Sequence, residues 1–204
     1  MNFILKSFGL LGLNQMRLSN YIYVKNFFTK EECNRVIDEG EKNLEDALLL
    51  NKGKNTDVRD TQVSFIYSGS DVQDLMQKVV NQIIAESSHF YKRDVHKFEA
   101  IQYTKYEKDM FYKWHTDSAS NLEELENNVR DMSASLVLSP REEYEGGSLQ
   151  MILNDCIDSN NVLTPHDVED QEQGTLIIFP SNVLHQVTPV TSGVRKSLVS
   201  WSRC

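Results

Sequence analysis

The C-terminal half of the chain is characterised by one stretch, Gly174-Thr-Leu-Ile-Ile-Phe-Pro-Ser-Asn-Val-Leu-His185. A run of β-branched and aromatic residues stops at a proline and a serine, and a second run starts shortly afterwards. Short runs of this kind, bounded by turn-forming residues, are typical of β-strands. From Phe98 onward we expect almost only strands, over residues 97–105, 111–117, 133–139, 148–153, 175–179, 184–189 and 196–202. Two polar, acidic segments, 121–129 and 154–173, interrupt them.

The N-terminal half begins with a short β-prone segment at 21–24 and a strong helix signal. Thr29-Lys-Glu-Glu32 is a capping box, because the threonine hydroxyl can accept a hydrogen bond from the Glu32 amide while the glutamate side chain reaches back. Cys33 and further apolar residues follow at helical spacing as far as Leu48. We therefore expect a helix that packs one face inward.

A second helix is expected after a polar loop at 50–60 and a strand at 62–67. Ser70 and Gln73 are expected to cap it. Its apolar residues recur three, four and one positions apart from Val72 to Ile84, which predicts a broad buried stripe.

The order of these elements predicts the fold class. Helices followed by many strands indicate an α+β protein, mainly β, with the N-terminal helices packed on the outside of one antiparallel sheet. So many short strands favour a double-stranded β-helix, a jelly roll of the cupin type. The helices need the sheet to bury their stripes, so we expect a single domain over 1–204. Within it, 1–20 are an N-terminal arm, 21–95 a helical support and 96–204 the jelly-roll core.

The composition narrows the possible partners. The chain has 204 residues, with 21 Lys and Arg against 30 Asp and Glu, and a net charge of −9. No nucleic-acid partner is expected, because coating phosphates needs a concentrated basic face. A cationic or neutral substrate is favoured over a polyanion. The apolar start MNFILKSFGLLGLN is too short to span a bilayer and lacks a small-residue cleavage site, so no membrane partner is expected.

The cysteines point to a compartment. Cys33, Cys156 and Cys204 are far apart and contain no CxxC pair. This sparse, odd count does not resemble a disulfide framework and favours the reducing cytoplasm. The sequence carries no signal for a particular oligomeric state.

Two of the five histidines stand in contexts that indicate a metal site. In Phe111-Tyr-Lys-Trp-His-Thr-Asp117, His115 and Asp117 are two positions apart, so on a strand both point to one face. His185 opens a later strand and can face the same cavity. Two imidazoles and one carboxylate suit Fe(II), because they leave positions open for a chelating cosubstrate and O₂. A hydrolytic zinc site can use similar ligands.

A cation and a phenol accompany these residues. Arg195 follows His185 by ten positions, one strand farther on. Its planar guanidinium can bind the far carboxylate of a dicarboxylate whose other end chelates the metal. Tyr106, nine residues before His115, can add a hydroxyl to the same carboxylate.

Four segments resemble, in order, the 2-oxoglutarate- and Fe(II)-dependent dioxygenases of the prolyl 4-hydroxylase-like (PKHD-type hydroxylase-like) group. They are Tyr106-x5-Tyr112-x2-His115-x-Asp117, Asp131-Met-Ser-Ala-Ser-Leu-Val-Leu-Ser139, Tyr144-Glu-Gly-Gly-Ser-Leu149 and Gly174-x4-Phe-Pro-Ser-x3-His185-x-Val-x-Pro-Val-Thr-x-Gly-x-Arg195-x5-Trp201. An HxD pair alone arises by chance, whereas all four motifs at this spacing are specific. The likeness spans nearly the whole chain after residue 20.

The resemblance implies that His115, Asp117 and His185 bind Fe(II) and form the catalytic centre. It also implies cosubstrate-binding residues, namely Arg195 for the distal carboxylate of 2-oxoglutarate, Tyr106 beside it and Tyr112 in the pocket lining. Other implied positions are Leu138, Gly147 and Trp201 as walls, and 59–62 as part of the substrate mouth. The glycine usual between the two tyrosines is replaced here by Glu107-Lys-Asp109.

The implied reaction hydroxylates an unactivated C–H bond with O₂ while 2-oxoglutarate is decarboxylated to succinate and CO₂, with ascorbate as a reductant. The substrate ranked first is a prolyl or other side chain of a peptide or protein. A free amino acid or a small metabolite stays open as substrate. So do a metal-binding jelly roll without turnover, and a cupin-type hydrolase or isomerase with another metal. Loops around 51–61, 118–131 and 154–173 are expected to select the substrate.

Overall fold

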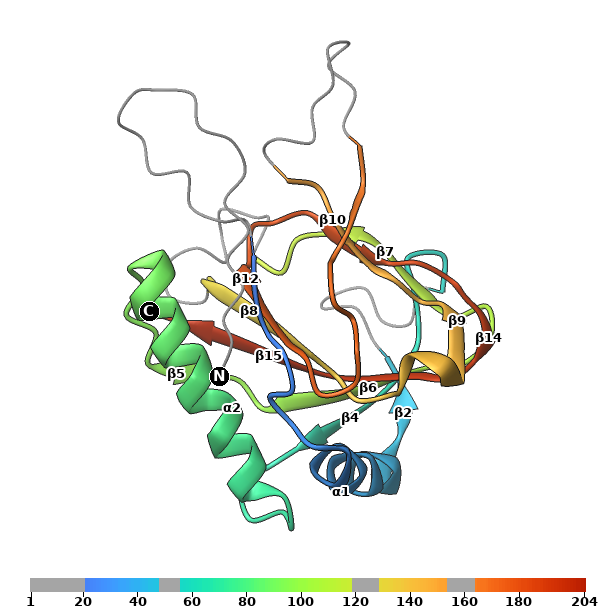
Figure 1. Cartoon of the computed structure of the whole chain (residues 1–204), viewed down its shortest axis with the longest axis horizontal. Helices are drawn as coiled ribbons and strands as arrows, with labels where there is room; N and C mark the ends of the chain where they lie inside the picture. Colours follow the sequence, from blue (N-terminus) through green and yellow to red (C-terminus); the bar gives the residue numbers. More distant parts are fainter. Residues whose placement is uncertain (1–20, 48–55, 119–128, 154–163) are drawn as a thin grey trace.

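The computed structural model describes residues 21–47, 56–118, 129–153 and 164–204 of the chain. This part of the protein is mainly β, with two α-helices and antiparallel strand pairing (Figure 1). The expected α+β, mainly β class is confirmed at this level. The predictions for the arm 1–20, and those for 121–128 and 154–163, lie outside the described residues.

The larger sheet has eight strands, with the longest strand at its centre. Its order is β1 (Ile22–Val24), β12 (Leu176–Pro180), β8 (Met132–Val137), β15 (Arg195–Arg203), β6 (Ile101–Tyr106), β4 (Gln62–Ile66) and β2 (Glu45–Asp46), with β5 (Lys97–Phe98) paired to the end of β15. Strand β15 pairs with β6 on one side, where Arg195 lies opposite Tyr106, and with β8 on the other.

The smaller sheet has five short strands. Their order is β11 (His166–Asp167), β10 (Leu149–Met151), β13 (His185–Val187), β7 (Phe111–His115) and β3 (Arg59–Asp60). In the pairing of β13 with β7, His185 lies directly opposite His115. A two-stranded ribbon of β9 (Tyr144–Gly146) and β14 (Val190–Gly193) lies at one end of the molecule (Figure 1).

Helix α1 (Lys30–Gly40) starts as the sequence predicts but ends earlier. The Thr29 hydroxyl accepts from the Glu32 amide at 3.2 Å and the Glu32 carboxylate accepts from the Thr29 amide at 2.8 Å, which completes the capping box. The expected continuation to Leu48 is wrong, because the chain makes one 3₁₀ turn at Glu41–Asn43 and then pairs with β4 as strand β2. Strand pairing therefore overrides the helical spacing after Gly40.

Helix α2 (Gln73–Glu86) buries the predicted stripe, although Ile84 at its edge is exposed. The predicted cap is wrong. Val72 is the N-cap, and no side chain from the described segments caps the helix, while the Gln73 amide oxygen accepts from the backbone of Gly69 instead. The helix continues into a π-helical turn at Ser87–Tyr91 and stops at Lys92, which has a left-handed backbone.

The large sheet is buried on both faces, which explains why β12 reads as an unbroken apolar run. Both helices pack against one face (Figure 1), where the sheet contributes Val24, Tyr103, Leu136, Ile178 and Leu198 to the core. The opposite face meets the smaller sheet through a second apolar cluster that includes Tyr106, Val137, Ile177 and Phe179 together with Leu149 and Met151. The helices thus lie outside the sheet pair, as predicted.

The expected strand at 97–105 is split in two. Glu99 separates β5 from β6, its amide donates to the Trp201 carbonyl, and its carboxylate accepts from Arg130 and Arg203. The Arg130 guanidinium also lies 3.9 Å from the Trp201 ring. This charged cluster fixes the end of β15, and no local sequence pattern marks it.

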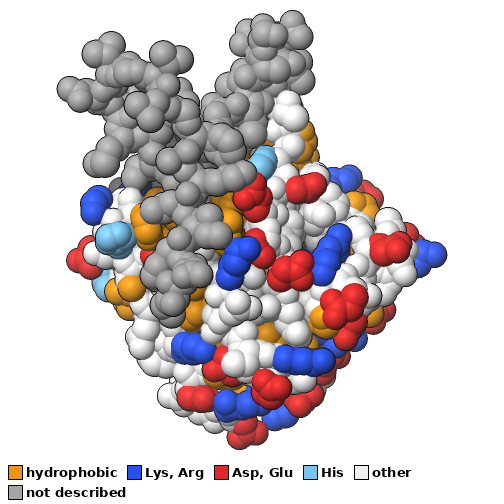
Figure 2. Space-filling model, in the orientation of Figure 1, with side chains coloured by type: hydrophobic (Ala, Val, Ile, Leu, Met, Phe, Trp, Pro, Cys, Tyr) orange, Lys and Arg blue, Asp and Glu red, His pale blue; other side chains and the backbone are white. Residues whose placement is uncertain are grey.

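Several short strands were not expected. Within the described residues, strands β9 and β14 pair only with each other, β2 lies on the edge of its sheet, and β3 lies within the segment expected to be a loop. Each has two to four residues, too few to show alternation. No helix in the described part of the chain is long and apolar enough to cross a membrane. On the face in Figure 2, the described acidic and basic side chains are interspersed.

The close packing of Gly40 against Tyr103 gives a testable prediction. A Cβ at this position would lie 2.2 Å from the ring, which is fully buried and whose hydroxyl donates to Glu41 at 2.7 Å. We expect Gly40→Ala to lower the free energy of unfolding, measured in urea, by about 2–3 kcal/mol. Gly69→Ala is the control, because Gly69 has φ +90° with nothing within 4 Å and should lose about 1 kcal/mol. Equal losses would contradict the packing explanation.

The cluster around Glu99 predicts a pH-dependent contribution to stability. Burial alone would raise the pKa of the Glu99 carboxyl, but Arg130 and Arg203 lower it. A lowered pKa means that the carboxylate stabilises the folded state above its unfolded pKa and that this contribution disappears as the pH falls through the folded pKa. Glu99→Gln should therefore cost about 1–2 kcal/mol at pH 7 and progressively less below about pH 4.5.

Urea unfolding of both proteins between pH 7 and pH 3.5 checks this prediction. Glu142→Gln provides the control, because Glu142 is exposed and makes no ion pair within the described residues. A difference between Glu99→Gln and the wild type that does not change with pH would show that the arginines do not act on the Glu99 charge.

Candidate active site

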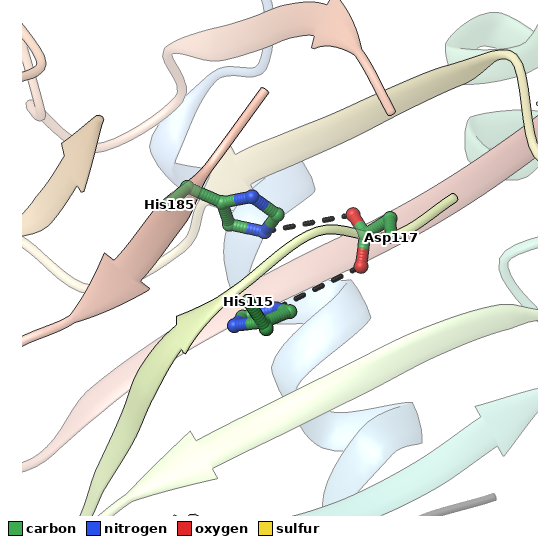
Figure 3. Close-up of side chains that lie close together, drawn as sticks. All are labelled: His115, Asp117 and His185. Carbon is green, nitrogen blue, oxygen red and sulfur yellow. Dashed lines mark ion pairs between the residues drawn. The ribbon is translucent and has the colours of Figure 1, made fainter. Parts of the chain in front are cut away.

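Three side chains that are candidates for metal binding converge between the two sheets. His115 is the last residue of β7, His185 is the first residue of β13, and Asp117 follows two residues after β7. The Nε2 atom of His115 lies 3.7 Å from Asp117 Oδ1, and that of His185 lies 3.6 Å from Oδ2 (Figure 3). One potential ligand atom from each residue lies within 4.8 Å of the others. The structure therefore brings together the three residues proposed from the sequence.

The strand expected at 111–117 is shorter than predicted, since it ends at His115. Asp117 is positioned from the other sheet rather than by strand alternation. The amides of Asp117 and Ser118 both donate to the carbonyl of Ser181, at 2.9 and 3.0 Å. Ser181 directly follows β12 and is the last residue of the Phe-Pro-Ser motif, so this motif fixes the backbone that carries the carboxylate.

Both imidazole rings are oriented by backbone carbonyls. His115 Nδ1 lies 2.7 Å from the Lys113 carbonyl oxygen, and His185 Nδ1 lies 2.9 Å from that of Val183. A carbonyl only accepts, so Nδ1 carries the proton in each neutral ring and Nε2 keeps its lone pair. The two Nε2 atoms are the ones directed at Asp117, which is the arrangement that a metal needs.

A buried serine, Ser133, holds the Asp117 carboxylate and is itself in contact with Ser181, an arrangement that no local sequence pattern indicates. The Ser133 hydroxyl donates to Asp117 Oδ2 at 2.7 Å and lies 2.8 Å from the Ser181 hydroxyl. Ser133 and Ser181 are both fully buried. Ser133 belongs to the Asp131–Ser139 segment, so the only available signal was membership in that motif.

The electrostatics favour the forms of these residues that bind metals. Burial, together with the nearby His185, lowers the pKa of His115 to about 4. Burial alone would raise the pKa of the Asp117 carboxyl, but His185, His115 and the Ser133 hydroxyl lower it. A neutral imidazole beside an ionised carboxylate needs no further proton loss before it can coordinate a cation. The donor set fits a divalent metal of the 2-His-1-carboxylate type.

Arg195 lies in the same pocket, and no charged partner for it is found in the described ranges. Its side chain is 1% exposed, Nη1 donates to the Ser197 hydroxyl at 3.0 Å, and Nε has no hydrogen-bond partner in the described part of the chain. Within the described residues, no carboxylate forms an ion pair with it. A buried guanidinium without a counter-charge is unfavourable unless an anion binds there. This orphaned cation fits a carboxylate of a ligand such as 2-oxoglutarate.

The two tyrosines implied for the cosubstrate have different surroundings. Tyr106 is buried, and its ring lies 5.4 Å from the Arg195 guanidinium. Tyr112 stacks on His115 with ring centroids 3.5 Å apart and an angle of 14° between the planes. Burial raises the pKa of Tyr112 to about 12, so its hydroxyl stays protonated at neutral pH. Both tyrosines line the pocket.

The implied walls are only partly found. Trp201 lines the pocket, whereas Leu138 is part of the core under the helices, and Gly147 packs on the Arg195 side chain from outside the pocket lining. In the segment Glu107-Lys-Asp109, which stands where the glycine is usual, Asp109 adopts φ +70° and its backbone amide donates to the Val190 carbonyl at 2.8 Å. The turn therefore forms without glycine, because Asp tolerates this conformation better than most residues.

The pocket also contains polar residues that the ligand motifs did not include. Arg59 from β3 and Gln102 from β6 line it, with Arg59 Nη2 donating to Gln102 Oε1 at 3.0 Å. Of these two, only Arg59 belongs to the 59–62 segment that the resemblance implies for the substrate mouth. Most of the loops expected to select the substrate lie outside the described residues.

Comparison with known proteins identifies the class to which this fold and site belong. The model of the 2OG-Fe(II) oxygenase superfamily matches residues 101–203, which include all three candidate ligands and Arg195. The chain belongs to this superfamily and is similar to its prolyl 4-hydroxylase-like members.

Individual relatives agree with this assignment. The PKHD-type hydroxylase YbiX of Escherichia coli O17:K52:H18 is 31% identical over 128 residues, which cover 62% of this chain and 53% of the relative. The chain thus spans about half the length of the curated relatives it matches.

Two solved structures share the fold. A Pseudomonas putida prolyl-4-hydroxylase superposes with a TM-score of 0.70 at 23% identity, over 90% of this chain and 92% of that one. A Trichoplax adhaerens prolyl hydroxylase, in complex with a hypoxia inducible factor peptide fragment, gives 0.68 at 15% identity, over 90% and 83%.

The hydrogen bond from Ser133 to Asp117 predicts a measurable effect on metal affinity. Ser133→Ala removes the donor that orients the carboxylate, and we expect affinity for Co(II) or Zn(II), measured by calorimetry, to fall about tenfold to a hundredfold. Ser135→Ala is a matched control, because Ser135 lies on the same strand and lines the pocket but makes no hydrogen bond to Asp117. Similar losses in both variants would show that strand packing, and not the hydrogen bond, determines the affinity.

Proposed function

We propose that the protein is an Fe(II)- and 2-oxoglutarate-dependent dioxygenase that hydroxylates an unactivated C–H bond. The observation that carries this proposal is the presence, in one pocket, of the His115, Asp117 and His185 donor set and of the orphaned buried guanidinium of Arg195. A metal site alone is compatible with many chemistries. The additional buried cation calls for an organic anion beside the metal, which is what this class of oxygenase uses.

The residues take the following roles in the proposal. His115 and His185 bind Fe(II) through Nε2, and Asp117 binds it through its carboxylate while Ser133 holds the second oxygen. Arg195 binds the distal carboxylate of 2-oxoglutarate, with Tyr106 beside it. When bound, Fe(II), 2-oxoglutarate and O₂ supply the oxidising chemistry, which releases succinate and CO₂ and adds a hydroxyl group to the substrate.

The chain itself orients the reacting groups and excludes water from the pocket. Apolar side chains of Leu149, Phe179, Val187 and Trp201 line the pocket among the polar groups. They limit water around the reacting atoms and strengthen the electrostatic interactions of Arg195. The stacking of Tyr112 on His115 restrains this imidazole, which is the more exposed of the two histidine side chains.

The substrate proposed first is a prolyl or other side chain of a peptide or protein. The names of the relatives support this choice, because they include a PKHD-type hydroxylase and a prolyl hydroxylase in complex with a peptide fragment. A free amino acid or a small metabolite is the alternative that the assays must include. Ascorbate belongs in those assays as a reductant.

We also propose that the two facing sheets form a double-stranded β-helix within a single domain. The supporting observation is that the two apolar clusters lie on opposite faces of the same eight-stranded sheet. The helical support at 21–95 contributes to the first cluster, and it shares that cluster with strands from the jelly-roll core at 96–204.

Binding of 2-oxoglutarate tests the role of Arg195. We expect Arg195→Gln to weaken 2-oxoglutarate binding to the Zn(II)-loaded protein about tenfold to a hundredfold, because a charge-assisted carboxylate contact is worth about 1.5–3 kcal/mol. The Zn(II) affinity itself should change little. Arg203→Gln is the control, because Arg203 lies at the far end of the same strand and pairs with Glu99.

Turnover gives the second part of this test. Fe(II)-loaded protein should form succinate from 2-oxoglutarate in the presence of O₂, and the rate should rise with a true substrate. Unchanged 2-oxoglutarate affinity in Arg195→Gln would falsify the assigned role. Metal binding without succinate formation, with any substrate pool, would instead favour a non-catalytic metal-binding protein.

A further inference from the structure

The pocket contains a second guanidinium that neither the metal site nor the cosubstrate site uses. Arg59 lies on β3 at the edge of the smaller sheet, opposite Tyr112 of β7. Its Cζ atom lies 4.7 Å from the centre of the Tyr112 ring, which in turn stacks on His115. The residue is half-buried, and it lines the same pocket as the candidate ligands.

The polar partners of Arg59 leave its charge unbalanced. Nη2 donates to the neutral side-chain amide of Gln102, and Nε is buried without a hydrogen-bond partner among the residues that the structure describes. No carboxylate in the described ranges forms an ion pair with it. A buried donor without a partner costs free energy, and a cation so placed costs more. A negatively charged hydrogen-bond acceptor would therefore satisfy both the charge and the free donor of Arg59.

The two guanidinium groups are held at separate places along the large sheet. The Arg195 guanidinium is held by Ser197, which lies opposite Thr104 on β6, whereas Arg59 is anchored to Gln102, which lies opposite Val199. Two residues along a strand separate these anchor positions, a distance of about 7 Å. The Arg195 guanidinium occupies one of these two anchor positions. Arg59 therefore lies in a different part of the pocket, next to Tyr112, whose ring stacks on the candidate metal ligand His115.

The charges of the complete proposed site point the same way. The two positive charges of Fe(II) balance the two negative charges of the 2-oxoglutarate dianion. The charged side chains that line the pocket, beyond the two histidines, are then two arginines and Asp117. One positive charge is left over, and a substrate that carries one negative charge would balance it.

We propose that Arg59, with Gln102, binds a carboxylate of the substrate close to the C–H bond that is hydroxylated. The substrate class is accordingly a carboxylate-bearing amino acid unit. Its carboxylate belongs to a free amino acid, to the C-terminal residue of a peptide, or to an acidic side chain. A carboxylate fits because guanidinium and carboxylate groups pair in a planar, bidentate manner. This inference rests on the proposed function, whose own test is the binding of 2-oxoglutarate at Arg195.

Matched pairs of ligands that differ only in this charge provide the test. The pairs are L-proline and L-prolinamide, L-leucine and L-leucinamide, N-acetyl-Ala-Pro with a free or an amidated C-terminus, and N-acetyl-Ala-Asp-Ala-amide with its Asn analogue. Binding to protein loaded with Zn(II) and 2-oxoglutarate is measured by calorimetry, and succinate release with Fe(II) is measured in parallel. The three kinds of pair distinguish the three sources of the carboxylate.

We expect the affinity of at least one carboxylate ligand to exceed that of its amide by a factor of about ten or more. Arg59→Gln should remove this preference. Gln102→Glu should remove it as well, although the guanidinium stays in place, because the new carboxylate would satisfy Arg59 internally. The Gln102 variant keeps the test decisive if Arg59→Gln is poorly folded, and thermal unfolding of each variant checks this point.

The other outcomes overturn the inference. Equal binding of the carboxylate and amide members would show that Arg59 does not read a negative charge, and so would a preference that survives in Gln102→Glu. Failure of every ligand to bind would do the same. The proposed function is judged separately, because 2-oxoglutarate binding and its loss in Arg195→Gln do not depend on Arg59.

Discussion

The antiparallel pairing of β13 with β7 is the constraint on which the site depends. His185 lies opposite His115 in this pairing, and the Cβ atoms of directly opposed residues in a sheet are about 4.5–5.5 Å apart. The two imidazoles must therefore converge on the same side, and their Nδ1 contacts with backbone carbonyls direct both Nε2 atoms inward. The third group, Asp117, reaches them because Ser181 fixes its backbone from the other sheet.

The two sheets divide the chemistry between them. The smaller sheet supplies both imidazoles and Arg59, whereas the larger sheet supplies Arg195 and Ser133. Burial of the large sheet on both faces gives these polar groups a rigid base. The result is a pocket with a local surplus of positive charge inside a chain whose net charge is −9. The net charge of the chain therefore does not indicate the sign of the charge inside the pocket.

Features with a local physical cause could be predicted from the sequence. The capping box at Thr29 is settled within one helical turn, and the stripe of α2 follows from its spacing. The positions of His115, Asp117, His185 and Arg195 could be proposed because they stand at fixed spacing within ordered motifs. All four line one pocket in the structure.

Features with a long-range cause could not be predicted. Helix α1 ends at Gly40 because β2 pairs with β4 and the Tyr103 ring leaves no room there for a side chain. The Asp117 carboxylate is held by Ser133, 16 residues away, and Ser133 in turn contacts Ser181, 48 residues farther on. A serine has the same appearance in a sequence whether it faces water or orients a carboxylate. The contact between Arg59 and Gln102 joins the two sheets across 43 residues and carries no local signal.

The unequal lengths of the strands have a consequence for motion. Strand β15 has nine residues and is paired on both sides, whereas β13 has three and β3 has two. Backbone amides in such short strands are released by small local openings, while those in the long central strand exchange only when most of the fold unravels. The layer that carries the imidazoles is therefore expected to exchange its backbone amides faster than the eight-stranded layer, through local openings that leave the larger sheet intact.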